Sequence, residues 1–300
     1  MITAPVNKII PFSSVDGFGN RTAVFLQGCN QNCLYCHNPE TIHMCISCGA
    51  CITTCPAGAL SWENGREGGW KSDRERIMEN GGRKVSYDFS KCCDCDTCLK
   101  TCSHGASPKI RMMSPNQVLE EIRPFFPFIN GITTSGGECS LYLDFLEELY
   151  RLVKTEKGTE PKTTYMDTNG QIPLWDKPSL LEVTDKTMID LKAGTEEDHI
   201  RLTGRGLAVP AENIRRMAAM GKLYEIRTVV MPGIVDNKKT VELGGSLIAD
   251  YPEVRYKLIR FRPYGVRVPY DRDIKEPTEE MMEELRRIAV TAGVKEVVVA

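Results

Sequence analysis

The stretch GCNQNCLYCHNPE, residues 28–40, places cysteines at positions 29, 33 and 36 and supplies no fourth cysteine in phase with them. An iron–sulfur cube has four irons, so three thiolates leave one iron open to a ligand from outside the protein. A zinc site made of the same thiols and completed by His37 is the alternative that the ligand types allow. The stretch therefore predicts a metal centre, and an open cube would make that centre a chemical site.

Composition bounds the kind of protein in which this centre works. The chain has 300 residues, 41% of them hydrophobic, and its 38 basic and 40 acidic side chains leave a net charge of -2. The length fits one large domain or two smaller ones, and the charge balance gives no gross attraction to nucleic acid or to an anionic membrane. The start MITAPVNKIIPFSS lacks the pattern of a secretion signal, and no apolar run approaches the roughly 20 residues that span a bilayer. We therefore expect a folded cytoplasmic protein.

Eight further cysteines form two runs, residues 45–55 and 92–102, which both read C-x2-C-x2-C-x3-C. Bacterial ferredoxins hold two [4Fe-4S] clusters with this spacing, and the last cysteine of each run ligates the cluster of the other run. Reducing conditions in the cytosol disfavour disulfides, so paired zinc sites are the remaining alternative. The crossing pattern predicts one auxiliary cluster on Cys45, Cys48, Cys51 and Cys102, and a second on Cys92, Cys95, Cys98 and Cys55.

These two runs define a predicted insert. Residues 44–108 are expected to form a ferredoxin-like domain, and residues 1–43 and 109–300 the main domain. The middle of the insert, NGREGGWKSDRERIMENGGRK at 64–84, is rich in glycine and charge, which predicts a long surface loop. Cys93 is out of phase with its run and Cys139 lies apart from all three groups, so neither is expected to ligate a cluster.

Beyond residue 110, apolar or β-branched runs alternate with amphipathic stretches, the pattern of parallel strands joined by helices. Ser114 followed by Pro115 predicts the start of one such helix. In a β/α barrel the loops after the strands open on one face, so polar residues at the strand ends are expected to converge. These residues are Gly136, Gly137, Glu138, Asp167, Thr168, Asn169, Asp190, Lys192, Arg227 and Arg262.

Together these features resemble the glycyl radical enzyme activating enzymes, the pyruvate formate-lyase activase family within the radical S-adenosylmethionine (SAM) superfamily. The pattern C-x3-C-x-aromatic-C, with Tyr35 as the aromatic residue, is similar to the cluster loop of the superfamily. The two-cluster insert resembles that of one subgroup of these activases. The residues that match the N-terminal signature of the family, in which Phe18 replaces the usual proline, are Asp16, Gly17, Gly19, Arg21, His37, Asn38 and Pro39. The implied fold is α/β, a partial (β/α)6 radical SAM barrel with an inserted ferredoxin-like domain.

The resemblance also implies a binding site for SAM. The open iron of the cluster on Cys29, Cys33 and Cys36 would chelate the amino and carboxylate groups of SAM. Glycines in the turn after one strand would let the backbone approach the methionine amino group. The residues implied to contact SAM are Tyr35, Asn38, Gly136, Gly137, Glu138, Asp167, Thr168, Asn169, Asp190, Lys192 and Arg227.

Two of these residues, Lys192 and Arg227, are catalytic candidates that would pair with the SAM carboxylate or with the substrate loop. The family further implies a monovalent cation, Na+ or K+, on Asp167, Thr168, Met188 and Asp190. His199 in the segment HIRLTG also matches the family, with a capping role as the competing interpretation. Relatives commonly have a histidine at the position of Arg262. The contact that this histidine makes with SAM therefore lacks its usual residue in this chain.

The implied activity is reductive cleavage of SAM to methionine and a 5'-deoxyadenosyl radical, which takes a hydrogen from a glycine of a partner glycyl radical enzyme. Three [4Fe-4S] clusters would serve it, SAM would be a co-substrate, and a flavodoxin or ferredoxin would donate electrons to an enzyme that is a monomer when free. An incomplete barrel has an open side, which suits a macromolecular substrate, and neither nucleic acid nor membrane is an expected partner. Two alternatives stay open: a radical SAM enzyme that acts on a small molecule or RNA, and a non-catalytic iron–sulfur electron carrier.

Overall fold

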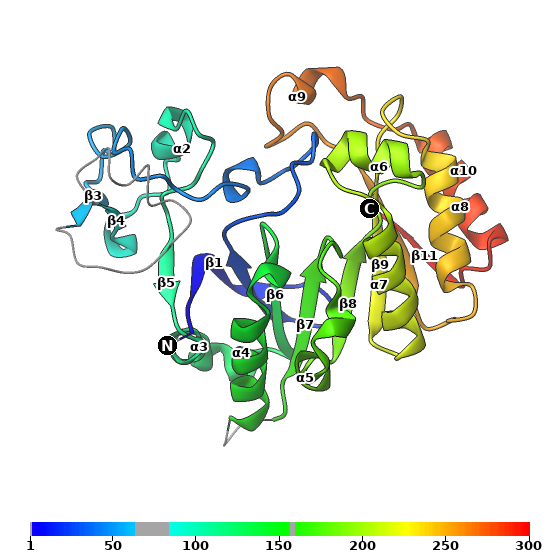
Figure 1. Ribbon diagram of the computed structural model, residues 1–300, viewed down its shortest axis with the longest axis horizontal. Helices are drawn as coiled ribbons and strands as arrows, with labels where there is room; N and C mark the ends of the chain where they lie inside the picture. Colours follow the sequence, from blue (N-terminus) through cyan, green and yellow to red (C-terminus); the bar gives the residue numbers. More distant parts are fainter. Residues whose placement is uncertain (1, 64–83, 157–159) are drawn as a thin grey trace.

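The computed structural model describes residues 2–63, 84–156 and 160–300 of the chain. The surface loop predicted for 64–84 therefore lies, apart from Lys84, outside the described residues. The main feature is a nine-stranded sheet with the order β11-β10-β9-β8-β7-β6-β2-β1-β5 (Figure 1). Its strands are β1 (Ala4–Ser13), β2 (Arg21–Leu26), β5 (Arg111–Met113), β6 (Gly131–Gly136), β7 (Thr163–Thr168), β8 (Lys186–Asp190), β9 (Leu223–Val230), β10 (Arg255–Arg260) and β11 (Glu296–Val299).

Strand direction divides this sheet into two parts. Strands β2 and β6 to β10 run parallel, and β11 adds a seventh parallel strand at one edge. Strands β1 and β5 are antiparallel and form the other edge. The sheet does not close on itself within the described ranges, because β5 and β11 each pair on one side only. The predicted partial (β/α)6 barrel is thereby confirmed, with three further strands at its edges.

Helices connect the parallel strands, as parallel pairing requires. The predicted helix start at Ser114 is confirmed: Ser114 and Gln117 form a reciprocal capping box, and Pro115 is the first helical residue. The helices turn apolar side chains toward the sheet, and those of Leu146, Leu149 and Tyr150 are fully buried in the shared core. The helices of the main domain are α3 (Pro115–Ile122), α4 (Leu143–Thr155), α5 (Pro178–Val183), α6 (Glu196–Thr203), α7 (Ala208–Ala219), α8 (Asn237–Ile248), α9 (Tyr270–Asp273) and α10 (Glu279–Thr291).

Residues 44–63 and 84–108 lie to one side of the sheet in Figure 1. Their described part contains an antiparallel pair, β3 (Leu60–Glu63) with β4 (Lys84–Tyr87), and the short helix α2 (Thr97–Thr101). This segment returns to the point where it leaves the main domain, because the Ser107 N–H donates to the Glu40 carbonyl at 2.8 Å. The Gln27 side chain holds the same junction by donating to the carbonyls of Glu40 and His43, both at 2.7 Å.

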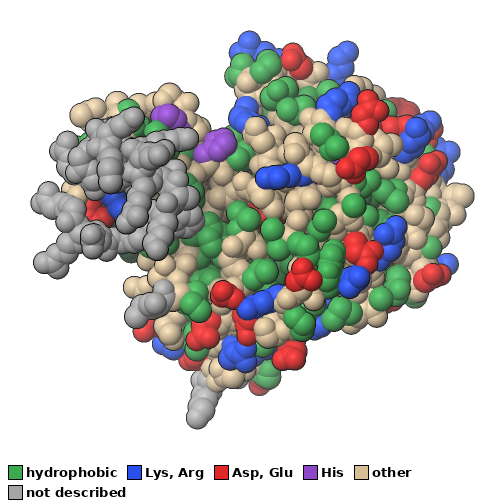
Figure 2. All heavy atoms as spheres, in the orientation of Figure 1, with side chains coloured by type: hydrophobic (Ala, Val, Ile, Leu, Met, Phe, Trp, Pro, Cys, Tyr) green, Lys and Arg blue, Asp and Glu red, His purple; other side chains and the backbone are tan. Residues whose placement is uncertain are grey.

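Basic and acidic side chains are intermixed on the face of the molecule drawn in Figure 2, in keeping with the near-zero net charge. Among the helices of the described ranges, none combines the length and the apolar character that a membrane crossing requires.

Candidate functional site

The predicted site residues lie where parallel strands end side by side. The pairing of β2 with β6 aligns Leu26 with Gly136, and the pairing of β8 with β9 aligns Asp190 with Arg227. The loops that follow these strands therefore open at the same edge of the sheet. The cysteine loop, residues 28–40, follows β2 at this edge.

The cysteine loop rests on the end of helix α6. The N–H groups of Asn32 and Leu34 donate to the carbonyls of Thr203 and Leu202, at 3.0 and 3.1 Å. A helix end has unpaired carbonyls, and here the loop supplies their donors. The start of the loop is held from another side, because the Cys29 N–H donates to the Ile42 carbonyl at 3.0 Å. The cysteines are thus presented by a backbone that is fixed at both its start and its middle.

His199 belongs to this support and not to the reactive edge. Its fully buried ring places Nδ1 2.7 Å from the Arg205 carbonyl, just beyond the end of α6. Burial lowers the pKa of His199, so the ring is neutral at physiological pH. The Thr203 hydroxyl donates to the His199 carbonyl at 2.7 Å in the same turn. These contacts favour the capping interpretation of the HIRLTG segment.

The three thiols of the loop are shielded from water. Cys33 is buried, and Cys29 and Cys36 are partly buried. Burial raises the pKa of Cys29 to about 12, with a further rise from Glu138, and burial also raises the pKa of Cys33 and Cys36. Cys33 adds to the raised pKa of Cys29, and Cys36 adds to that of Cys33. Thiolates form here only with a cationic partner, and this donor set suits an iron–sulfur cluster.

In the part of the chain that the structure describes, no three His, Cys, Asp or Glu side chains converge as tightly as a single metal ion requires. A cube distributes its ligands over four irons, so this finding bears on one-ion sites only.

Lys192 joins the cysteine loop to β8. Its buried Nζ donates to Asp190 Oδ2 at 2.8 Å and to the Tyr35 hydroxyl at 3.2 Å. Burial raises the pKa of Tyr35, so its hydroxyl stays protonated and fixed on the lysine. The Lys192 charge also acts on the Cys33 thiol, where it opposes the effect of burial. The structure thus brings Lys192 together with Asp190, Tyr35 and one of the three cysteines.

Glu138 connects two of the predicted segments through its carboxylate. It accepts from the Thr168 hydroxyl at 2.6 Å, from the Asn169 N–H at 2.7 Å and from the Ser140 N–H at 2.9 Å. The side chain is 2% exposed, so these three donors compensate a buried charge. Both oxygens are therefore engaged inside the protein, and Glu138 fixes the end of β7 to the end of β6.

Gly136 and Gly137 pack against backbone and not against open space. Gly136 has φ +121°, and a Cβ there would lie 2.2 Å from the Leu26 carbonyl oxygen. A Cβ at Gly137 would lie 2.3 Å from the Gly28 carbonyl oxygen and 2.7 Å from that of Thr41. A side chain at Gly136 would therefore meet β2, and one at Gly137 would meet the backbone of Gly28 and Thr41. Packing thus gives both glycines a reason of its own, and the close approach of SAM to this turn stays a prediction.

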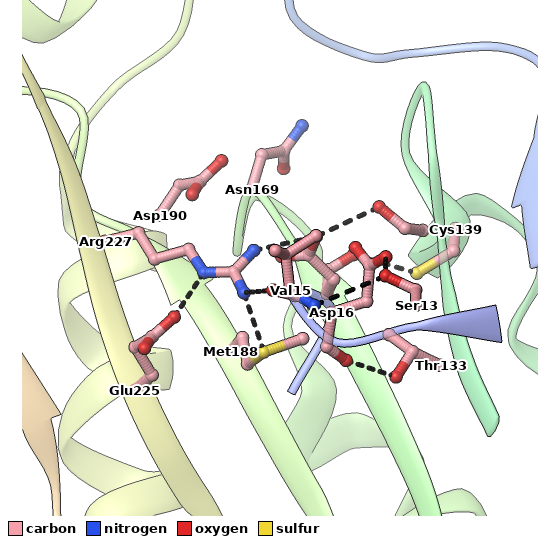
Figure 3. Close-up of polar contacts among 12 residues, drawn as sticks. Ser13, Val15, Asp16, Thr133, Cys139, Asn169, Met188, Asp190, Glu225 and Arg227 are labelled. Atoms are coloured by element: carbon pink, nitrogen blue, oxygen red, sulfur yellow. Dashed lines mark hydrogen bonds and ion pairs between the residues drawn. The ribbon is translucent and has the colours of Figure 1, made fainter. Parts of the chain in front are cut away.

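Arg227 lies at the centre of a charged network inside the barrel (Figure 3). Its guanidinium pairs with Asp167 at 3.1 Å, with buried Glu225, and donates to Met188 Sδ at 2.9 Å. Glu225 pairs in turn with Arg255. Burial raises the pKa of Asp167 to about 6, while Arg227 opposes that rise. Three of these residues, Asp167, Met188 and Arg227, were predicted site residues, whereas Glu225 and Arg255 were not.

The residues predicted to hold a monovalent cation have partners within the protein. Asp167 pairs with Arg227, and Asp190 pairs with Lys192. The Thr168 hydroxyl donates to Glu138, and Met188 accepts from Arg227.

Asn38, a predicted SAM contact, uses its backbone carbonyl within the cysteine loop. This carbonyl accepts from the N–H and the hydroxyl of Thr41, at 3.0 and 2.7 Å.

The loop before β2 reaches into the same interior. The Asp16 carbonyl accepts from the Thr133 hydroxyl at 2.6 Å, and its carboxylate accepts from Ser13. The neighbouring Val15 carbonyl faces Arg227 Nη2 at 3.4 Å (Figure 3). In the sequence, Asp16 matched the N-terminal signature of the family, but no role was predicted for it or for this loop.

Arg21 holds this loop in place through hydrogen bonds of its buried guanidinium. Its guanidinium is 1% exposed and donates to the Thr133 hydroxyl at 2.7 Å, to the Phe18 carbonyl and to the strands on either side. The guanidinium carbon also lies 3.7 Å from the centre of the Tyr165 ring. All five donors find acceptors, so an arginine with no carboxylate partner can be buried here.

The side chain of Arg262 is exposed, and the contact of this residue with the site is made by its backbone. The Arg262 carbonyl lies 2.8 Å from His37 Nε2, at the end of the cysteine loop. Arg267, five residues later, donates from Nη2 to the Cys33 carbonyl at 2.9 Å. The sequence singled out Arg262 and missed Arg267, since no motif marks the latter.

The two cysteine runs of residues 44–108 share one backbone conformation. Ser47 and Asp94, each two residues after the first cysteine of its run, have φ of 55° and 51°. Such values are uncommon outside glycine, so their recurrence at equivalent places marks a repeated loop. The same holds two residues later at Gly49 and Asp96, with φ of 79° and 56°.

The repeat continues beyond the last cysteine of each run. Gly58 and Gly105 have φ of 60° and 59°, and the N–H groups that follow donate to the Sγ atoms of Cys55 and Cys102, at 3.3 and 3.4 Å. The hydroxyls of Thr54 and Thr101, which precede these cysteines, are 3.2 Å apart. Two copies of one loop therefore meet face to face.

Comparison with known proteins agrees with the fold and the cysteine loop. The sequence profile of the radical SAM superfamily matches residues 23–243. A protein of Haemophilus influenzae that is named for the activation of glycyl radical enzymes is 26% identical, over 99% of this chain and 96% of its own length. The isethionate sulfite-lyase activating enzyme of Desulfovibrio desulfuricans is 30% identical, over 87% of this chain and 83% of its own.

Among solved structures, QueE from Escherichia coli has a similar fold, with a TM-score of 0.51 at 13% identity over 99% of this chain and 94% of that one. The superfamily implies a [4Fe-4S] cluster and SAM, and the three shielded thiols after β2 fit such a cluster. The profile match, the activating enzymes among the relatives and the partial barrel together show that this chain belongs to the radical SAM superfamily and, within it, to the glycyl radical enzyme activating enzymes, which are oxidoreductases.

Proposed function

We propose that this enzyme generates a radical from SAM and transfers it to one glycine of a partner glycyl radical enzyme. SAM and one electron give methionine and the 5'-deoxyadenosyl radical, which takes a hydrogen atom from the glycine Cα and leaves 5'-deoxyadenosine and a glycyl radical. When bound, a [4Fe-4S] cluster on Cys29, Cys33 and Cys36 supplies the electron and a coordination site for SAM.

The contact between the end of β7 and the cysteine loop carries this proposal. Asn169 Nδ2 lies 3.7 Å from Cys29 Sγ and donates to Asn30 Oδ1 at 2.8 Å. The Glu138 carboxylate accepts from the backbone N–H of Asn169, so the turn after β6, which contains Glu138, adjoins the same end of β7. A molecule bound at the cluster would therefore meet the ends of β6 and β7, which is what SAM binding in this family requires.

Lys192 is the residue that we assign to the SAM carboxylate. An ammonium group has three N–H donors, and Asp190 and Tyr35 take two of them. The third donor and the charge beside Cys33 suit a carboxylate that is chelated at the cluster. We assign Arg227 to the substrate side, where it orders Asp167 and the loop at Val15 and Asp16.

The open edge of the sheet supports a protein substrate. Within the described residues the barrel does not close, because β5 and β11 each pair on one side only, and an open side suits a macromolecular substrate. We propose that the glycine-bearing loop of the partner enters there. No observation on the described residues favours RNA or a small molecule over this loop.

We further propose that residues 44–108 are a ferredoxin-like domain with two [4Fe-4S] clusters. The repeated loop conformation supports two equivalent sites. Burial raises the pKa of Cys45, the Ser47 N–H opposes this rise, and Cys102 and Cys48 add to it, which supports the crossing of Cys102 into the first run. The first auxiliary cluster would lie on Cys45, Cys48, Cys51 and Cys102, and the second on Cys92, Cys95, Cys98 and Cys55.

Three further parts of the proposal concern partners and ions. A flavodoxin or ferredoxin would reduce the auxiliary clusters, and the free enzyme would be a monomer. A Na+ or K+ ion near Asp167 and Asp190 would have to compete with Arg227 and Lys192, which pair with these carboxylates at 3.1 and 2.8 Å.

The test combines anaerobically reconstituted protein, SAM, dithionite and a glycyl radical enzyme from the same genome. We expect 5'-deoxyadenosine together with a glycyl radical signal in electron paramagnetic resonance (EPR). The matched control is the same partner with its radical glycine replaced by alanine, which should give no radical. Formation of 5'-deoxyadenosine with RNA or a small molecule, and no radical on any such partner, would refute the proposal.

A further inference from the structure

The segment after β10, residues 261–274, closes over the outer side of the cysteine loop. Phe261, Val266 and Ile274 share a buried cluster with Cys33 and Tyr35. Hydrogen bonding adds to this packing, because His37 Nε2 lies 2.8 Å from the Arg262 carbonyl. The cysteine loop is therefore covered by a part of the chain more than 200 residues away in sequence.

Arg267 is the charged residue that this segment brings to the loop. Its Nη2 donates to the Cys33 carbonyl at 2.9 Å, which fixes the backbone at one of the three cysteines. Its Nε is buried and has no hydrogen-bond partner among the described residues. A buried donor of an always-charged group is costly when it stays unpaired, so an absent acceptor is expected beside it.

The neighbourhood of Arg267 indicates which acceptor is absent. Arg267 contacts the cysteine loop at Cys33, and Cys36 packs against the buried cluster that contains both Cys33 and Val266, the residue before Arg267. A cluster held by these thiolates carries sulfur acceptors and negative charge, which together match a free N–H and a positive charge.

One competing partner lies on the same segment. Asp271 Oδ1 is also buried and has no partner within the described ranges, and the Asp271 N–H donates to the Arg267 carbonyl at 3.2 Å. The two side chains do not form an ion pair in the structure, as Arg267 uses Nη2 on the cysteine loop instead. The two residues are joined by this backbone hydrogen bond, so the experiment must separate the two partners.

We propose that Arg267 is a positioning residue of the SAM cluster, which fixes the cysteine loop through Cys33 and favours the reduced cluster through its free N–H and its charge. Reduction adds one negative charge to the cluster, and a nearby fixed positive charge stabilises the product of that step more than the starting state. The inference rests on the cluster of the proposed function and is independent of the partner enzyme.

The experiment is a redox titration of the full-length reconstituted protein, followed by EPR. The SAM cluster is recognised as the signal component that changes when SAM is added. In Arg267→Gln we expect the ratio of reduced to oxidised SAM cluster at a given potential to fall about tenfold, which is 59 mV for a one-electron couple. Arg267→Lys keeps the charge and should recover most of this loss.

Two controls separate charge and pairing effects. Arg272→Gln removes an equal charge from an exposed position of the same segment and should stay within twofold of the wild type. Asp271→Asn should do the same if Arg267 serves the cluster and not Asp271.

The proposal is overturned if Arg267→Gln titrates like Arg272→Gln, or if Asp271→Asn changes the titration as much as Arg267→Gln. If Arg267→Gln does not retain the iron of this cluster, Arg267→Lys decides: a near wild-type titration supports the proposal, and lost iron overturns it. A wild-type protein without any SAM-responsive signal would instead refute the proposed function.

Discussion

Replacing Gly137 with alanine separates two reasons for a glycine in the turn after β6. If SAM alone needs the space, the metal-free chain should tolerate a methyl group. In the structure, however, a Cβ at Gly137 would lie 2.3 Å from the Gly28 carbonyl oxygen and 2.7 Å from that of Thr41, closer than the 3.0 Å that real Cβ atoms keep. The start of the cysteine loop must therefore move in this variant.

The magnitude follows from the bonds that this movement strains. The Glu138 N–H donates to the Gly28 carbonyl at 2.7 Å, and the Gly28 N–H donates to the Thr41 carbonyl at 2.8 Å. Overpacking costs roughly 1–3 kcal/mol, and a buried hydrogen bond contributes about 1 kcal/mol. We expect Gly137→Ala to lower the free energy of unfolding of the metal-free chain by about 3 kcal/mol, and to reduce the iron bound at the SAM cluster.

The assay is urea unfolding of the metal-free chain, with iron content and SAM affinity measured after reconstitution. Gly221→Ala is the matched control, because Gly221 has φ +65° and nothing lies within 4 Å of its Cβ position. That control should cost about 1 kcal/mol, the conformational cost alone. A Gly137→Ala chain that unfolds like the wild type without metal, yet loses SAM binding, would refute the packing argument and restore SAM as the reason.

Four other predictions test the site and its support. Replacing Cys29, Cys33 and Cys36 with Ala should remove about four of about 12 irons and all 5'-deoxyadenosine formation, whereas replacing Cys48 and Cys95 should leave some formation under dithionite; equal loss in both would contradict separate roles. Cys93→Ser and Cys139→Ser should each keep full iron content, since Cys93 is exposed and Cys139 is buried against the Thr134 and Asp167 carbonyls; loss of a cluster's iron in either would show otherwise. Arg21→Lys should destabilise the chain in urea by about 3 kcal/mol, because an ammonium leaves at least two of five acceptors unpaired, while exposed Arg216→Lys should change stability by under about 0.5 kcal/mol. Burial raises the pKa of Asp167 from an unfolded value of about 4 to about 6, so folding takes up a proton and the stability contributed by this carboxyl falls as pH rises through that window; Asp167→Asn should flatten that part of the profile, and an unchanged slope would argue against the assignment.

The sequence predicted those parts of the fold that have local signals. Ser114 and Pro115 mark the start of α3, because an N-cap and a first-turn proline act within one turn. The ends of the parallel strands were found because polar residues such as Asp167 and Asp190 interrupt buried runs. The strands outside the six-stranded barrel, β1, β5 and β11, were not predicted, because no local sequence signal marks them.

Side-chain partners could not be predicted in this way. Glu138 was predicted as a SAM contact, but the three donors around it, which make it a link between β6 and β7, have no local signal in the sequence. Arg262 was predicted among the polar residues at the strand ends, and its contact with His37 is made by its carbonyl, which no sequence pattern marks. Arg267 reaches Cys33 only after the chain has completed the barrel, so no spacing between the two could indicate the bond.

The junction of residues 44–108 has a consequence for how such a protein can change over evolution. The Ser107 N–H meets the Glu40 carbonyl at 2.8 Å, so the chain leaves the main domain and re-enters it at one place. The strands on either side, β2 and β5, are both joined to β1 and keep their pairing whatever lies between those two points. A segment whose ends adjoin can be gained, lost or exchanged in one genetic event, because a short bridge restores the connection. The cysteine-rich segment is therefore a cassette, and a lineage could acquire or discard it without redesigning the barrel.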